Sequence, residues 1–396
     1  MKWSNIWSYT QQDYRSWPST IREQKQVIRI RSNHYGQSLK LRFSNQFGEE
    51  DLIFEQVRVR ICQEDGEAVS ETKVVTVNGK EQVFIVPTAN LISDEVALAV
   101  VPGAVIEIET VVRGVTILRS GTISYSKGSV DVYNYSLADA NEGLVEQEEA
   151  FRMIKENNQM FFIYGISGVD LLTSDSARTI VAFGDSLTQQ GFWVEAFKQR
   201  LLKAKLHEVA VLNRGIGGSR VLKGQNPLAD EYTRHGQAGL FRFEKEVFAY
   251  GCVDAVIILH GINDLISRHD GTNEYHYTVT QIIDGLKQYA KLAHQHNIEV
   301  IIGTLTPLGK SMFYSEALEL ERKEINTWIS QSDCFDHVID FDMAVHDEAQ
   351  VSLLRKECDA GDGLHISAIG GEKMASIIEL SYVNSIIHTQ KKEEEK

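Results

Sequence analysis

The chain has 396 residues, enough for two or three domains, and its 43% hydrophobic and 24% charged residues are typical of a soluble globular protein. The formal net charge of −15 argues against nucleic acid or an anionic membrane as a partner, because binding to phosphate groups needs a basic surface.

The cysteines and the first residues of the chain narrow the class of protein further. Cys62, Cys252, Cys334 and Cys358 show no CxxC spacing, so neither a zinc site nor a disulfide framework is expected. The N-terminal segment lacks the apolar stretch of a secretion signal, and no run of about 18 apolar residues occurs. We therefore expect a cytoplasmic protein without a membrane partner.

Residues 1–172 show the two-residue periodicity of antiparallel strands. Apolar and polar side chains alternate, wholly or in part, in Gln26–Ser32, Ser38–Asn45, Glu55–Ile61, Thr72–Val77, Gln82–Pro87 and Ala104–Val112. Glycine or Asn-Gly stands in the turns between them, as hairpins require. The spacing predicts an all-β sandwich or jelly-roll domain over residues 1–172. The acidic segment Ser136–Gln159 is interpreted as either helix or loop.

From residue 173 onward, short apolar runs alternate with longer segments of helical periodicity. The candidate strands are Thr179–Gly184, Glu208–Asn213, Asp254–Gly261, Glu299–Thr306 and His337–Asp342. This alternation predicts right-handed crossovers and an α/β domain of residues 173–388 with a doubly wound, parallel, five-stranded sheet. Residues 389–396 are expected to form a disordered tail.

In a doubly wound sheet, functional groups gather beyond the carboxyl ends of the strands. Four segments in such positions are Gly184–Leu187, Asn213–Arg220, Gly261–Asp264 and Asp359–Ser367. In the first, Ser186 stands at a strand-to-helix turn and is a candidate nucleophile. The alternative is that Asp185 or Ser186 only caps the helix that follows.

A nucleophilic serine needs a base, and the base needs an orienting acid. Among the 12 histidines, only His365 has an aspartate, Asp362, three residues before it. Such a turn can hold the imidazole in the tautomer that accepts a proton. Taken alone, the two residues favour the alternative of a surface pair at the start of a helix near Ser367.

Acyl transfer also needs hydrogen-bond donors for the developing oxyanion. The glycines of Asn213–Arg220 allow a main-chain N–H to approach a ligand closely. A phosphate loop is disfavoured there because no Gly-Lys-Ser/Thr follows. Asn263 offers a side-chain amide, unless it only forms a turn at the strand end. Four such features at the strand ends of one sheet favour a single active site.

The segments GDSLT, NRGIGG, GIND and DGLHIS resemble the four signature blocks of the SGNH, or GDSL, hydrolases. The resemblance extends over residues 178–385 and implies a flavodoxin-like serine esterase that needs no metal or organic cofactor. The matching triad residues are Ser186, Asp362 and His365. The matching oxyanion donors are the N–H groups of Ser186 and Gly218 and the amide of Asn263, with Gly217 as the less favoured glycine.

A closer likeness, in NRGIGGSRVL, TLTPLG and DHVIDFD, is to a subgroup that includes xylan and other carbohydrate esterases and often carries an N-terminal β-sandwich. It implies a carbohydrate ester as the substrate. Short acyl groups, above all acetyl, are expected because the hydrolase half has no long apolar insertion that could act as a lipase lid. A small-molecule acylated sugar is expected because the secretion signal of the secreted relatives is not seen. One alternative is a lipase or thioesterase of the same fold. Another is an inert sugar-binding protein, which the intact set of site residues disfavours.

Two further features have open interpretations. His260 precedes the GIND block, where the resemblance predicts an apolar or acidic residue, and is interpreted as a packing residue. After the glycine segment, the sequence has a cluster of three arginines, Arg220, Arg234 and Arg242. They either bind a substrate carboxylate or pair with Glu231, Glu244 and Glu246.

Overall fold

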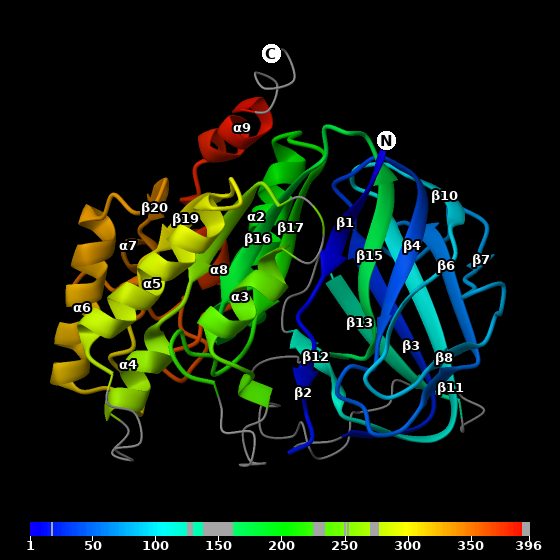
Figure 1. The fold of residues 1–396 in the computed structure, drawn as a ribbon, viewed down its shortest axis with the longest axis horizontal. Helices are drawn as coiled ribbons and strands as arrows, with labels where there is room; N and C mark the ends of the chain where they lie inside the picture. Colours follow the sequence, from blue (N-terminus) through cyan, green and yellow to red (C-terminus); the bar gives the residue numbers. More distant parts are fainter. Residues whose placement is uncertain are drawn as a thin grey trace. The chain divides into compact units, whose positions relative to one another are not determined.

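The computed structural model describes residues 1–16, 19–124, 130–137, 161–224, 234–248, 251, 253–269 and 277–389. The chain divides into two compact units, one of residues 1–177, 201–210 and 226–234, and one of residues 178–200, 211–225 and 235–396 (Figure 1). Most of Ser136–Gln159, the tail after Thr389, Cys252 and Glu231 lie outside the described residues.

The described residues from Met1 to Thr173 form β-strands and their connections, as the sequence predicts. The strands are β1 (Lys2–Ser8), β2 (Gln12–Asp13), β3 (Ser19–Arg31), β4 (Gly36–Ser44), β5 (Leu52–Phe54), β6 (Gln56–Cys62), β7 (Lys73–Val74), β8 (Val83–Ile85), β9 (Asn90–Ile92), β10 (Val96–Val100), β11 (Val105–Leu118), β12 (Ser120–Ser124), β13 (Val130–Ser136), β14 (Phe161–Ile163) and β15 (Gly165–Thr173). The two larger antiparallel sheets have the orders β1-β15-β4-β10, with β9 beside β4, and β13-β3-β11-β6-β7.

In these strands, the apolar residues of the alternating pattern are buried and the polar residues between them face outward. In β4, Leu39, Leu41 and Phe43 are fully buried, whereas Lys40 and Arg42 between them are partly exposed. One face of the strand therefore supplies the core, as period two requires.

The C-terminal unit has the predicted α/β architecture. Its strands are β16 (Arg178–Gly184), β17 (Val209–Gly215), β18 (Ala255–Leu259), β19 (Glu299–Gly303) and β20 (His337–Ile339). Its helices are α1 (Ser186–Gln189), α2 (Phe192–Lys203), α3 (Gly239–Phe248), α4 (Ile262–His269), α5 (Val279–His294), α6 (Glu316–Gln331), α7 (Phe341–Val345), α8 (Ala368–Ser376) and α9 (Leu380–Thr389). The strands form a five-stranded parallel sheet in the order β17-β16-β18-β19-β20.

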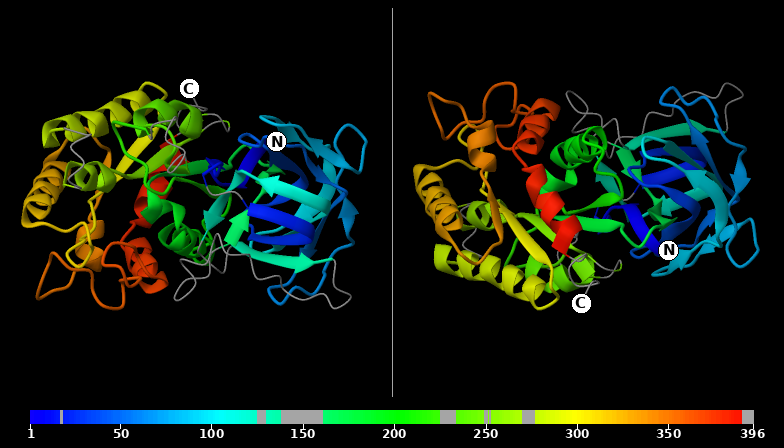
Figure 2. Two further views of the ribbon diagram at one scale, coloured as in Figure 1. Left: turned by 90° about the horizontal axis from the view of Figure 1, so that it is seen from below. Right: turned by 90° about the horizontal axis from the view of Figure 1, so that it is seen from above.

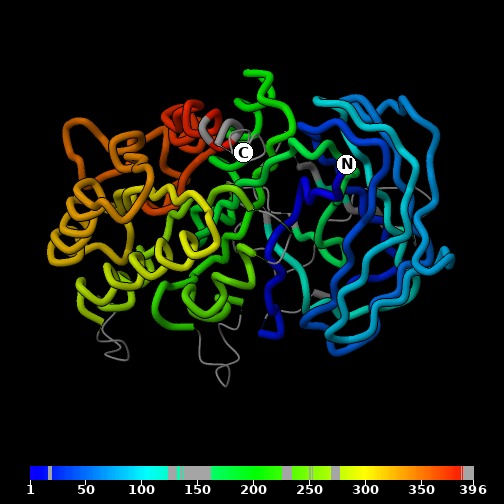
Figure 3. Tube along the Cα trace, turned by 45° about the horizontal axis from the view of Figure 1, so that its top comes forward, coloured from blue at the N-terminus to red at the C-terminus, as the bar shows by residue number. Residues whose placement is uncertain are grey.

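Helices cover both faces of this sheet (Figure 2). On one face, α3 packs on α5 through stacked rings of Phe243 and Tyr289, whose centroids are 4.7 Å apart. On the other, α2 contacts α7 through Trp193 and Phe341. Figure 3 follows the chain through the unit from green at β16 to red at α9. No helix in the described part of the chain is long and apolar enough to span a membrane.

The first strand of the sheet along the chain, β16, lies between β17 and β18. The chain runs from β16 to its neighbour β17 on one side and then to β18 on the other side. Ligands of such sheets bind where the order reverses, beyond the carboxyl ends of the central strands. The segments that follow β16, β17 and β18 therefore meet at one edge of the sheet.

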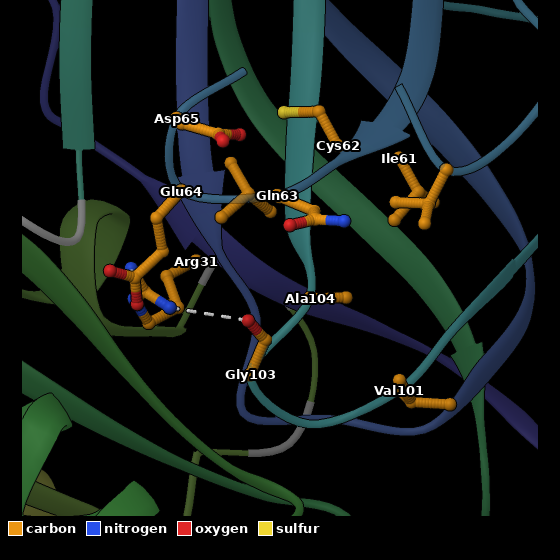
Figure 4. A pocket seen from close by; sticks show the side chains of 11 residues that line it. Arg31, Ile61, Cys62, Gln63, Glu64, Asp65, Val101, Gly103 and Ala104 are labelled. Carbon is orange, nitrogen blue, oxygen red and sulfur yellow. Dashed lines mark hydrogen bonds and ion pairs between the residues drawn. The ribbon is translucent and has the colours of Figure 1, made fainter. Parts of the chain in front are cut away.

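A hollow of about 570 Å³ lies at one end of the sandwich unit (Figure 4). Arg31 extends along it, pairs with Glu64 at 2.7 Å and donates to the carbonyl oxygen of Gly103 at 3.3 Å. The Arg31 guanidinium is thus already paired within its own unit.

Candidate active site

Three of the predicted site residues form a continuous chain of hydrogen bonds. Ser186 begins α1 directly after β16, and its Oγ lies 2.9 Å from Nε2 of His365. Nδ1 of the same imidazole lies 2.6 Å from Oδ2 of Asp362. In this arrangement the imidazole can accept a proton from the serine while the carboxylate fixes its tautomer.

Asp362 is held as a carboxylate by its surroundings. Burial alone raises its pKa, but the hydrogen bond and charge of His365 and the main-chain N–H groups of Leu364 and His365 outweigh burial and hold the pKa well below its usual range. The two N–H donors lie 3.0 and 2.8 Å from Oδ1. The Asp362 carboxylate, which faces the imidazole, is therefore negatively charged at neutral pH.

The loop that carries Asp362 and His365 is anchored by Gly363. Its φ of 75° lies in the left-handed region, and a Cβ there would lie 2.4 Å from the carbonyl carbon of Lys310 and 2.5 Å from the nitrogen of Ser311. The glycine thus allows the loop to pack directly on a neighbouring main chain.

We expect Gly363→Ala to lower both stability and activity, because the methyl group would displace the loop that carries His365. Backbone strain alone costs about 1 kcal/mol, and the overlap adds to it. Gly79→Ala is the matched control, since its φ of 73° is nearly the same but its added Cβ would meet nothing within 4 Å. Urea unfolding and ester hydrolysis should show the larger loss for Gly363→Ala, and equal losses would contradict this assignment.

The N–H groups of Gly217 and Gly218, in the glycine segment after β17, differ in their hydrogen bonding. Gly217 donates to Oε1 of Gln189 at 2.5 Å. The N–H groups of Gly218 and Ser186 make no hydrogen bond within the described part of the chain. Position 217 is next to the serine, because a Cβ built there would lie 3.7 Å from Cβ of Ser186.

Two residues of α4 tie this segment to the third strand. Asn263 donates from Nδ2 to the carbonyl oxygen of Ser219 at 3.0 Å, which leaves its second amide hydrogen available. The buried carboxylate of Asp264 accepts from the N–H groups of Val221 and Leu222 at 2.8 and 3.1 Å. Burial raises the pKa of Asp264 to about 6, against the opposing effect of these donors.

The candidate residues are reached from solvent although their neighbours are not. The partly exposed positions are Ser186, Gly217, Gly218, Asn263 and His365. Asp185 and Leu187 on either side of the serine, and Asp264 after the asparagine, are buried. The site thus combines accessible polar groups with a buried support.

Arg242 of α3 belongs to that support, and neither proposed role for it matches its contacts. It is 3% exposed and donates to the carbonyl oxygens of Gly184 at 2.7 Å and Arg214 at 2.9 Å. Its guanidinium also lies 4.1 Å from the centroid of the Phe183 ring. It therefore joins the ends of β16 and β17, from which the serine and the glycine segment extend.

His260 is a packing residue, as interpreted from the sequence. It is buried, its Nδ1 lies 3.0 Å from the hydroxyl of Tyr289, and its ring meets Phe183 edge-on. Burial, helped by the charge of Arg242, lowers its pKa to about 3. The ring is consequently neutral at physiological pH.

Asp185 is a buried carboxyl whose ionisation affects stability. Its Oδ1 accepts from the N–H of Leu187 at 3.0 Å, whereas Oδ2 has no hydrogen-bond partner in the described part of the chain. Burial raises its pKa to about 7, and the nearby carboxyl of Asp264 contributes in the same direction. The folded protein therefore holds this proton at pH values where the unfolded chain, with a pKa of about 3.9, has released it.

Stability should consequently fall as the pH rises from about 4 to 7, by up to about 1.4 kcal/mol per pH unit from this group. Asp185→Asn keeps an acceptor for Leu187 and removes the titration. We expect the free energy of unfolding of Asp185→Asn to increase relative to that of the wild type as the pH rises from about 4 to 7. Urea unfolding at pH 5, 6, 7 and 8 measures the difference, and a constant difference would refute the assignment.

Sequence reasoning did not single out Gln189, Asp264 and the clamping role of Arg242. Asp264 follows Asn263 directly, so its position in the GIND block was an available signal. For Gln189 and Arg242, no spacing signal exists, because their partners are main-chain atoms placed by the fold. Among the described residues, no group of three or more His, Cys, Asp or Glu side chains is placed to hold a metal ion.

Comparison with known proteins identifies the family of this half of the chain. Residues 182–373 match the model of the GDSL-like lipase/acylhydrolase family. None of the curated proteins shows a significant match.

Several solved structures are similar to about half of the chain. A GDSL-like lipase from Bacteroides thetaiotaomicron has 19% identity and a TM-score of 0.38, over 52% of this chain and 89% of its own. The acetyl xylan esterase AlAXEase has 18% identity and a TM-score of 0.38, over 52% of this chain and 99% of its own. A mutant acetyl-xylooligosaccharide esterase from Geobacillus Stearmophilus has 19% identity and a TM-score of 0.40, over 53% and 94%.

The family match extends from within β16 to within α8 and includes every residue of the site described above. Residues 182–373 therefore form a domain of the GDSL-like lipase/acylhydrolase family, and the chain is a carboxylic ester hydrolase.

Proposed function

We propose that the chain hydrolyses short acyl esters, above all acetyl esters of a sugar, through a covalent acyl-enzyme on Ser186. His365 takes the proton of the serine as Oγ attacks the ester carbonyl, and then gives it to the leaving alcohol. Asp362 orients the imidazole and stabilises its charged form. Water, activated by the same imidazole, then releases the acid.

The observation that carries the proposal is the hydrogen-bonded series from Ser186 Oγ through the His365 imidazole to the Asp362 carboxylate. The negative carboxylate favours the imidazolium that forms in both transition states. The main-chain N–H groups of Ser186 and Gly218 have no partner among the described residues. These two groups and the second hydrogen of the Asn263 amide are available for the oxyanion.

The acyl and alcohol groups are proposed on different grounds. A short acyl group is favoured because the hydrolase half has no long apolar insertion that could act as a lipase lid. A sugar is favoured by the likeness of NRGIGGSRVL and TLTPLG to carbohydrate esterases.

One observation favours a longer acyl chain as the second candidate. Met312, Phe313 and Tyr314 are exposed to 89%, 40% and 36%, and follow directly on Ser311, which packs against Gly363 of the histidine loop. Exposed apolar side chains in such a position could bind an acyl chain.

Hydrolysis of p-nitrophenyl acetate, p-nitrophenyl octanoate and peracetylated xylose by the wild type and by Ser186→Ala separates these candidates. The proposal predicts acetate release from the sugar by the wild type and its loss in the variant. A clear preference for octanoate would favour a lipase or thioesterase instead. A folded wild type no more active than the variant on all three esters would overturn the proposed function.

A further inference from the structure

Gln189 joins the helix turn of the nucleophile to the glycine segment that follows β17. It is the last residue of α1, is 6% exposed, and accepts the N–H of Gly217 at 2.5 Å. Only the amide oxygen can accept this bond, so the side-chain orientation is fixed.

The main chains of the two segments are also packed together. A Cβ on Gly215 would lie 2.1 Å from the nitrogen of Gln189, so no side chain fits between them. Asn213 donates from Nδ2 to the carbonyl oxygen of Thr188 at 2.7 Å and accepts the N–H of Gly215 at 2.9 Å. The serine turn and the glycine segment are therefore closely packed through their main chains, and Gln189 adds a side-chain hydrogen bond between them.

The hydrogen bond that Gln189 accepts makes the N–H groups of Gly217 and Gly218 different. That of Gly217 is occupied, whereas that of Gly218, where φ is 73°, has no partner within the described part of the chain. Glycine peptides rotate readily because no side chain restricts them. Without the acceptor, the Gly217 N–H would lack its partner, and the peptide could turn this group instead toward an anion beside Ser186.

We propose that Gln189 is a positioning residue that keeps Gly217 out of the oxyanion hole and aims the N–H of Gly218 into it. This inference rests on the proposed function, because it concerns the donor that serves the reaction of Ser186. It also gives the physical reason for Gly218, rather than Gly217, as the donor. The bond acts on the geometry of the transition state and not on binding of the ground-state ester.

Gln189→Met tests the inference because it keeps the length of the side chain and removes the acceptor. For p-nitrophenyl acetate we expect kcat to fall about 10- to 100-fold, as for a displaced oxyanion donor, while KM changes by less than about threefold. Phenylboronic acid, which forms a tetrahedral adduct with serine hydroxyls, should bind more weakly by a similar factor. Thermal unfolding establishes that the variant is folded.

Gln190→Met is the matched control, because this buried neighbour has a side-chain oxygen without a hydrogen-bond partner in the described residues. It should retain the kcat of the wild type. If Gln189→Met does not fold, Gln189→Ser replaces it, since the short side chain cannot reach Gly217 either, and the same results are expected.

Unchanged kcat in a folded Gln189 variant would overturn the inference. So would a fall in kcat without weaker binding of the boronic acid, or an equal fall in Gln190→Met. Ser186→Ala, assayed in parallel, distinguishes failure of the proposed function, because activity that survives loss of the serine would refute that function whatever the Gln189 variants do.

Discussion

Ser186→Ala is expected to reduce kcat for p-nitrophenyl acetate by on the order of 10⁴-fold or more, because the acyl-enzyme can no longer form. The loss of one hydroxyl should leave the fold intact, since the Ser186 side chain is partly exposed and its hydrogen bond is to the partly exposed His365. The thermal unfolding midpoint should therefore stay close to that of the wild type.

Ser330→Ala provides the control for this prediction. Its hydroxyl is exposed on α6 and donates to the carbonyl oxygen of Asn326 at 2.9 Å. This variant should hydrolyse the ester at the rate of the wild type. Activity retained by purified Ser186→Ala would mean that another group attacks the ester.

Asn263→Ala is expected to lower kcat by about 10²- to 10³-fold, the usual effect of removing one oxyanion donor. The amide lies at the start of α4, held near the glycine segment by its bond to the carbonyl oxygen of Ser219. Because the donor acts on the developing charge, KM should change much less than kcat.

The measurement is steady-state hydrolysis of p-nitrophenyl acetate together with thermal unfolding. A kcat within about threefold of the wild type would show that the Asn263 amide only shapes the loop. An equal rise in KM and fall in kcat/KM, with kcat unchanged, would assign it to substrate binding instead.

The fold could be predicted from the sequence where each element carries its own pattern. The strand predicted from Thr179 to Gly184 lies within β16, and the strand predicted from Glu299 to Thr306 contains β19. β1 was not predicted, because its residues show no clean alternation. It becomes a strand by pairing with β15, about 165 residues away in the chain.

The reactive residues of the site could be predicted from the sequence, whereas the residues that hold them in place could not. Ser186 and His365 lie 179 positions apart, and only the rule that strand ends meet, with the family resemblance, connected them. Their roles stay predictions. The partners of Gln189 and Arg242 are main-chain groups whose positions depend on the packing of α1 and α3, and no residue spacing encodes that.

The central claim is that Ser186 attacks the ester, and covalent labelling tests it most directly. The protein is treated with a fluorophosphonate, which reacts with activated serines, and the adduct is located by peptide mass spectrometry. The account predicts one adduct, on the peptide that contains Ser186, absent from Ser186→Ala and formed far more slowly in His365→Ala. A hydrolytically active protein that is labelled elsewhere, or that is labelled equally fast without His365, would contradict it.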